Sequence, residues 1–169
     1  MNTSENEPIF VRDLMTVGVA TCPPDASIMD VARLLLNQNL DELVVLDGGH
    51  AVGVIGQTEL VGICCRQDSE RLSVKDVMRE DVPQVPADIP LQAAMQIMLD
   101  RGIRSLYLMH HAAGIEYPAG KLTFQHLLRF LVAEKPDDIS DLGIHAARKS
   151  PVEMFIQRRD EARKLRGQS

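Results

Sequence analysis

An internal duplication constrains the fold of this chain more than any other feature. The segment VRDLM at residues 11–15 returns as VKDVM at residues 74–78, an offset of 63 positions. Two pairs of turn residues and one pair of apolar runs keep the same offset: Pro23 and Asp25 with Pro86 and Asp88, and residues 43–46 with residues 106–109. Two similar halves usually pack around a pseudo-two-fold axis, and related clefts form where they meet.

Each half is predicted to fold in the order strand, helix, strand, strand, helix. In both copies, segments with helical spacing of apolar residues can be told apart from short apolar runs of strand length. The predicted helices of the two halves are residues 28–37, 58–65, 91–101 and 124–132, and the paired strands are residues 43–46, 51–55, 106–109 and 120–122. The second copy has a longer connection, residues 110–119, around the place of the turn at residues 47–50, and the offset rises by four there.

Composition favours a soluble, cytoplasmic protein. Apolar residues make up 45% of the 169 positions and charged residues 25%, which is the mixture of a globular domain. No apolar run approaches the roughly 20 residues of a membrane span, and the polar, acidic N-terminus resembles neither a signal peptide nor a transit sequence. The three cysteines lack disulfide-framework spacing and are expected to be small buried thiols, and the five histidines lack the spacing of a zinc site.

The duplicated motifs resemble a tandem pair of cystathionine β-synthase (CBS) domains, a Bateman module. The resemblance rests on four motifs in a fixed order: the paired V-x-D-x-M segments, P-x-D-x-S-I at residues 23–28, LVVLDGG at residues 43–49, and GVIGQTEL at residues 53–60. The last is close to the family pattern G-h-h-T-x-x-D-L, where h is apolar. The likeness covers roughly residues 9–133, and the duplication at one offset makes it specific.

This resemblance implies a mixed α/β (α+β) fold, in which two βαββα CBS repeats are related by a pseudo-two-fold axis and followed by a C-terminal helical tail. The expected divisions are a flexible N-terminus, two repeats, and an acidic connection with a basic C-terminal helix, at residues 1–8, 9–67, 68–135 and 136–169.

The resemblance also implies a regulatory module and not an enzyme. Such pairs commonly bind adenine-containing ligands, here AMP, ADP, ATP or a related adenosyl ligand, and require no cofactor. No G-x-S-x-G elbow, phosphate-binding P-loop or H-E-x-x-H helix competes with this interpretation.

In the family pattern a threonine hydroxyl holds phosphate and an aspartate binds the ribose hydroxyls. The first repeat departs from this pattern, because Gly56 stands in place of the threonine and Glu59 in place of the aspartate. Glu59 keeps an acceptor for a diol, or it simply faces the positive end of its helix dipole. Asp41 and Glu42 precede the hairpin, where they would repel phosphate.

The second repeat keeps Thr123 but has His126 in place of the aspartate. Arg104 stands just before the strand, where relatives can place a phosphate-binding base, and Lys121 shares a strand face with Thr123. Any nucleotide is therefore expected to prefer the cleft that contains Thr123. The alternatives are that Thr123 caps the helix after it, that His126 is a partly exposed helix residue, and that Arg104 and Lys121 are solvated charges.

Two functions remain open from the sequence. One is a homodimeric ligand sensor, and the other is a CBS-fold dimerisation or interaction module that has lost nucleotide binding. A dimer is expected in both cases, because each half leaves a helical apolar face uncovered. The candidate residues of these faces are Leu60, Ile63 and Cys64 in the first repeat and Leu127, Phe130 and Leu131 in the second.

The C-terminal tail differs from the rest of the chain in charge. Residues 1–144 carry a net charge of −10 and residues 145–169 a net charge of +4. Pro151 suits the first turn of a helix, and Val152, Phe155 and Ile156 would form its apolar anchor. The tail either docks on its own acidic module or serves a partner protein or an anionic surface. Nucleic-acid binding is disfavoured by the acidity of the module.

Replacing Phe155 by alanine separates the first two alternatives. If the tail docks on its own module, Phe155→Ala should lower the free energy of unfolding by about 3 kcal/mol or somewhat less, because a buried aromatic contact is lost. If the tail serves a partner, the thermal midpoint of the isolated protein should not change. Thermal denaturation of both proteins is the measurement, and an unchanged midpoint would exclude docking on the module.

Overall fold

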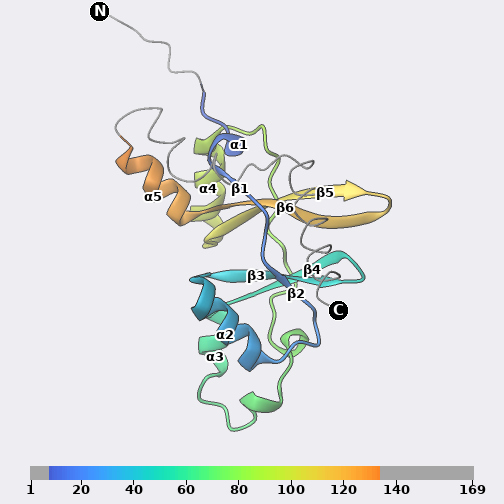
Figure 1. The fold of residues 1–169 in the computed structure, drawn as a ribbon. Helices are drawn as coiled ribbons and strands as arrows, with labels where there is room; N and C mark the ends of the chain where they lie inside the picture. Colours follow the sequence, from blue (N-terminus) through green and yellow to red (C-terminus); the bar gives the residue numbers. More distant parts are fainter. Residues whose placement is uncertain (1–7, 134–169) are drawn as a thin grey trace, which may run out of the picture.

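The computed structural model describes residues 8–133 of the chain, so the predicted tail helix with Val152, Phe155 and Ile156 lies outside the described residues. These residues form two α/β halves, each built on a three-stranded sheet (Figure 1). The sheets face each other, and helices lie on their outer sides. Between the sheets, Val44, Val54 and Tyr107 form a fully buried cluster. The predicted mixed fold of two repeats is therefore confirmed.

The first repeat contains the predicted helix-strand-strand-helix unit. Ser27 caps α2 by accepting a hydrogen bond from the Met29 amide, and Asn39 ends the helix in the left-handed region. Gly48 and Gly49 adopt positive φ in the turn between β3 and β4. The elements are α1 (Val11–Leu14), β1 (Thr16–Val17), β2 (Thr21–Cys22), α2 (Ile28–Gln38), β3 (Glu42–Asp47), β4 (His50–Gly56) and α3 (Gln57–Ile63).

The second repeat follows two short 3₁₀ helices, η1 (Ser69–Arg71) and η2 (Val74–Asp76). Its elements are α4 (Leu91–Arg101), β5 (Ser105–Ala112), β6 (Ile115–Thr123) and α5 (Phe124–Val132). Both helices begin and end at the predicted residues. Gly102 ends α4 in the left-handed conformation. No helix in the described part of the chain is long and apolar enough to cross a membrane.

Two predictions about local structure were wrong. Residues 110–119 are not a loop, because β5 and β6 continue as a hairpin to a turn at Ala113 and Gly114, both with positive φ. The His110 ring contacts the Tyr117 ring across this hairpin with 5.3 Å between centroids, and such cross-strand pairs stabilise a ladder. The cysteines are also not all buried, since Cys22 is buried but Cys64 and Cys65 are exposed.

The leading segment of each repeat packs on the other repeat. β1 pairs antiparallel with β6, placing Thr16 opposite Lys121, although Thr16 belongs to the leading segment of the first repeat. Val11 and Leu14 are buried in the core of the second repeat. The converse holds in the linker, the segment of residues 64–90 between α3 and α4, where Val74 is buried in the core of the first repeat. The two repeats are therefore tied together by exchanged segments.

Two equivalent glycines allow this exchange. A Cβ atom on Gly53 would lie 2.6 Å from the Arg79 carbonyl oxygen, and one on Gly120 would lie 2.8 Å from the Thr16 carbonyl oxygen. Both distances are shorter than van der Waals contact, so a side chain would push the leading segment away. In both repeats, a glycine of the second hairpin strand therefore allows the leading segment of the other repeat to approach closely.

Candidate ligand cleft between the repeats

A cavity of about 110 Å³ lies where the repeats meet. It is lined by the start of β3, the turn from β4 into α3, the linker and the end of α4. Its lining residues are Asp41, Glu42, Gly56, Gln57, Thr58, Glu59, Arg79, Gly102, Ile103 and Arg104. Both repeats contribute walls, so any ligand here would contact both.

Glu59 is the charged centre of this cavity. It stands in the first turn of α3, and its carboxylate Oε2 accepts a 2.9 Å hydrogen bond from the Gly56 amide. Its other oxygen, Oε1, lies 3.4 Å from Nη1 of Arg79. The side chain is only 13% exposed. Both carboxylate oxygens are therefore engaged by the protein itself.

The replacement of threonine by Gly56 has a steric cause. A Cβ atom at this position would lie 2.6 Å from both the Asp41 carbonyl oxygen and the Glu42 Cβ atom. The start of β3 therefore occupies the space that a threonine side chain would need. The first repeat has no room for a phosphate-binding hydroxyl at this point.

Arg79 is the site residue that the sequence reasoning missed. Its Nη2 lies 3.6 Å from Oε2 of Glu42, so its guanidinium bridges the largely buried carboxylates of Glu42 and Glu59. Glu42 also accepts a 2.6 Å hydrogen bond from the Tyr107 hydroxyl. The Nε atom of Arg79 is buried without a hydrogen-bond partner. The available signal was the duplication, because Arg79 occupies the position that Thr16 holds in the first copy.

Two predicted basic residues lie around this network. Arg104 lines the same cavity as Gly56 and Glu59, although the sequence grouped it with Thr123. Lys121 is half-buried in β6, and burial lowers its pKa while the carboxylates of Glu42 and Asp41 raise it. The positive charge of Lys121 is therefore attracted to these acidic residues of the first repeat.

Thr123 and His126 satisfy each other at the start of α5. The Thr123 amide donates to His126 Nδ1 at 3.1 Å, and the His126 amide donates to Thr123 Oγ1 at 3.4 Å. Both side chains are buried, so His126 is not the partly exposed helix residue considered from the sequence. Burial, followed by the nearby Arg129 and Lys121, lowers the pKa of His126 to about 4. The ring is neutral at pH 7, and since Nδ1 accepts, Nε2 carries the hydrogen and is a donor.

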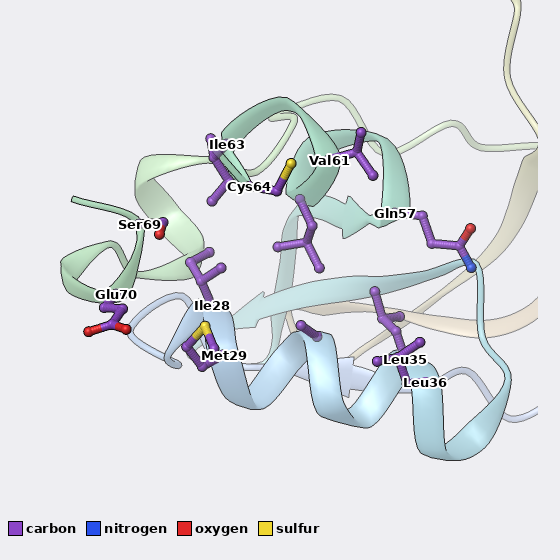
Figure 2. A pocket seen from close by; sticks show the side chains of 12 residues that line it. Ile28, Met29, Leu35, Leu36, Gln57, Val61, Ile63, Cys64, Ser69 and Glu70 are labelled. Carbon is purple, nitrogen blue, oxygen red and sulfur yellow. The ribbon is translucent and has the colours of Figure 1, made fainter. Parts of the chain in front are cut away.

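A second surface feature is an apolar groove of about 550 Å³ between α2 and α3. Figure 2 shows Met29 and Leu36 from α2 on one side of it, and Val61 from α3 and Cys64 just after that helix on the other. Leu36 is 81% exposed and Val61 70% exposed. Of the apolar face predicted for dimer contact in the first repeat, only a part is exposed, because Ile63 packs into the core of its own repeat.

The matching face of the second repeat lies on α5. Leu128 and Leu131 are exposed there, at 61% and 76%, whereas Leu127 and Phe130 pack partly against the core of their own repeat. Each repeat therefore presents large apolar side chains on its outer helices, which is uncommon for a surface that stays in water.

Comparison with known proteins finds one family and many similar structures. A family model described as the CBS domain matches residues 11–65 and 74–133. An uncharacterised 17.7 kDa protein of Acidianus ambivalens is 31% identical over 97 residues, which are 57% of this chain and 58% of that protein. The chain thus matches little more than half the length of this curated relative.

Two solved structures show the likeness in fold. The CBS domain pair of protein MJ0100, in complex with 5′-methylthioadenosine and S-adenosyl-L-methionine, has a TM-score of 0.66 at 20% identity and covers 76% of this chain and 99% of its own. The CBS-domain protein ATU1752 of Agrobacterium tumefaciens has a TM-score of 0.64 at 24% identity, covering 73% and 98%.

The buried His126 should make stability depend on pH. The pKa of His126 is about 4 in the folded protein and 6.5 in the absence of its surroundings. Between these values the unfolded chain binds the additional proton, so stability is fully present above about pH 6.5 and is lost as pH falls toward 4. We expect wild type to lose roughly 2 kcal/mol more than His126→Gln between pH 7 and pH 4.5.

Glutamine is the suitable variant because it can still cap the first turn of α5 but does not titrate. Carboxylates titrate in both proteins, so the difference between two denaturant titrations isolates His126. Equal losses of stability in the two proteins would contradict a buried neutral imidazole.

Proposed function

Because the chain belongs to the CBS domain family, we propose that it is a regulatory module that binds an adenosyl ligand in a cleft between its repeats and transmits occupancy to a partner. The observation that carries this proposal is the cavity between the repeats, walled by both of them and by the linker. A ligand in such a place contacts two halves at once, so its binding free energy depends on their relative position.

Similarity in fold and the chemistry of the site both support an adenosyl compound as the ligand. The similar domain pair of MJ0100 is described in complex with 5′-methylthioadenosine and S-adenosyl-L-methionine, and both ligands share adenosine and lack phosphate. In this chain Asp41, Glu42 and Glu59 surround the first cavity. Their charge disfavours polyphosphates more than adenosine itself.

Ligand binding can be tested on the full chain by thermal shift and calorimetry. The probes are 5′-methylthioadenosine, S-adenosylmethionine, AMP and ATP, with GMP as a matched control that lacks adenine. A ligand that binds only the folded state stabilises it by about 2.7 kcal/mol at a hundredfold excess over Kd. We expect a rise in midpoint with at least one adenosyl probe and none with GMP. No rise with any probe at millimolar concentration would contradict the proposal.

A second candidate function is an interaction module, and the apolar groove favours it. The groove between α2 and α3 and the exposed residues of α5 occupy equivalent places in the two repeats. We propose a second copy of the chain as their occupant, because a two-fold contact buries the same patch on both partners at once. The C-terminal segment with Val152, Phe155 and Ile156 is the element proposed to bind a further protein partner.

A charged substitution in the groove tests this homodimer. Val61→Glu should convert the dimer into an 18.7 kDa monomer, because it places a carboxylate in an apolar contact. The side chain of Val61 is exposed, so the fold itself should be kept. His50→Glu, at the exposed first residue of β4, is the control. Sedimentation at tens of micromolar protein is the measurement, and a wild type that sediments as a monomer would contradict the proposal.

A further inference from the structure

Two adjacent cysteines stand open to solvent at the start of the linker. Cys64 and Cys65 directly follow α3, and both are exposed. Their Sγ atoms lie 3.7 Å apart, within hydrogen-bonding distance for sulfur. The Cys64 amide donates to the Val61 carbonyl oxygen at 3.4 Å, and the Arg66 amide donates to the Ile63 carbonyl oxygen at 2.9 Å. The backbone on both sides of the pair is therefore held by the end of α3, and the two thiols lie side by side.

The third cysteine has a different environment. Cys22 is buried in the core of the first repeat, and burial raises the pKa of its thiol to about 11. A thiol that is both covered and protonated is inert at pH 7. Thiol chemistry on the folded protein is therefore confined to Cys64 and Cys65.

The adjacent positions disfavour a disulfide between the two exposed cysteines. The peptide bond that joins them is trans, and Cα atoms across a trans peptide are about 3.8 Å apart. Disulfides usually join Cα atoms that are roughly 4.4–6.8 Å apart, and shorter spans are strained and easily reduced. Cys64 and Cys65 are therefore expected to persist as two thiols.

A metal ion is also a poor occupant of the pair. Within residues 8–133, no group of three or more His, Cys, Asp and Glu side chains is arranged to hold a metal ion, whereas structural zinc sites take four protein ligands. Two thiols without a further donor suit an atom that forms two bonds to sulfur and brings its own third substituent. Trivalent arsenic in an organoarsenoxide, R–As=O, has this valence, and it is a soft centre that prefers sulfur ligands.

The protonation of the pair suits condensation with such a compound. The hydrogen bond with Cys65, followed by Coulombic interaction with Cys65, raises the pKa of the Cys64 thiol, so Cys64 carries its proton at pH 7. In the condensation, the two arsenic–oxygen bonds of R–As=O are replaced by two arsenic–sulfur bonds. The two thiol protons leave with the oxygen as water, and arsenic remains trivalent throughout. No oxidant or reductant is consumed.

The surface beside the pair suits an apolar substituent on the arsenic. Cys64 is one of the residues that line the groove between α2 and α3, together with Met29, Leu60 and Val61 (Figure 2). Arsenic bonded to Cys64 therefore carries its substituent at the edge of this groove. An apolar substituent gains by leaving water for such a surface.

We propose that Cys64 and Cys65 form a dithiol site that covalently binds a trivalent organoarsenical, with its apolar substituent against the groove between α2 and α3. The site is separate from the cavity between the repeats, so it does not depend on the proposed adenosyl ligand. A second copy of the chain in the groove would compete with the substituent, because both would contact Val61.

The test is retention of phenylarsine oxide by the folded, full-length chain, measured by intact-protein mass spectrometry in dilute protein. The reaction is run in excess glutathione, a monothiol that removes arsenic from single cysteines but does not compete well with a chelating pair. Wild type should retain one phenylarsenic group per chain and should release it to a small-molecule dithiol. The adduct should also protect Cys64 and Cys65 from a chromogenic disulfide reagent.

Three variants with two cysteines each provide matched controls. Cys22→Ala keeps the adjacent pair and should retain the phenylarsenic group as wild type does, whereas Cys64→Ala and Cys65→Ala should retain none. Circular dichroism confirms the fold of each, and the comparison of wild type with the last two decides the question by itself. A wild type that retains no phenylarsenic group in glutathione would overturn the proposal. Equal retention by folded Cys64→Ala or Cys65→Ala would overturn it as well.

Discussion

The exchange of leading segments between the repeats is the constraint on which the rest of the structure depends. β1 completes the sheet of the second repeat, and the segment around Val74 is buried in the first. Neither half would close its apolar core alone, because Val11 and Leu14 are supplied to one core and Val74 to the other. Burying each such side chain stabilises the fold by about 1.5–3 kcal/mol. The same exchange positions the cavity between the repeats, since Arg79, which follows Val74 in the chain, lines it.

Much of this organisation could be predicted from the sequence. The helices of residues 91–101 and 124–132 were placed correctly because strong end signals, Gly102 and Thr123, coincide with apolar periodicity. The extended β5–β6 hairpin was missed because its strands carry histidines and a proline, which weaken a β pattern. Which helical residues stay exposed also depends on tertiary packing. Ile63 and Val61 look alike in the sequence, but one is buried and the other is 70% exposed.

The candidate site was predicted less completely than the fold. Gly56, Glu59 and Arg104 were named from the sequence and do lie in one cavity. The bridge by Arg79 could not be derived from motif spacing, because it joins Glu42 and Glu59, residues 37 and 20 positions earlier in the chain. Such a contact depends on where the linker passes, and that path is fixed by long-range packing.

Equivalent positions of the two repeats show which residues of a duplicated unit can diverge. Gly53 and Gly120 must both remain glycine, since a Cβ atom at either would collide with the leading segment. Glu59 and His126, at equivalent positions of the two repeats, have diverged instead. The two residues differ in charge and in partner: Glu59 is paired with Arg79, whereas His126 is neutral at pH 7 and accepts a hydrogen bond from the Thr123 amide. A buried carboxylate without a ligand needs a cation, so an acidic residue at this position and an arginine in the linker stabilise each other.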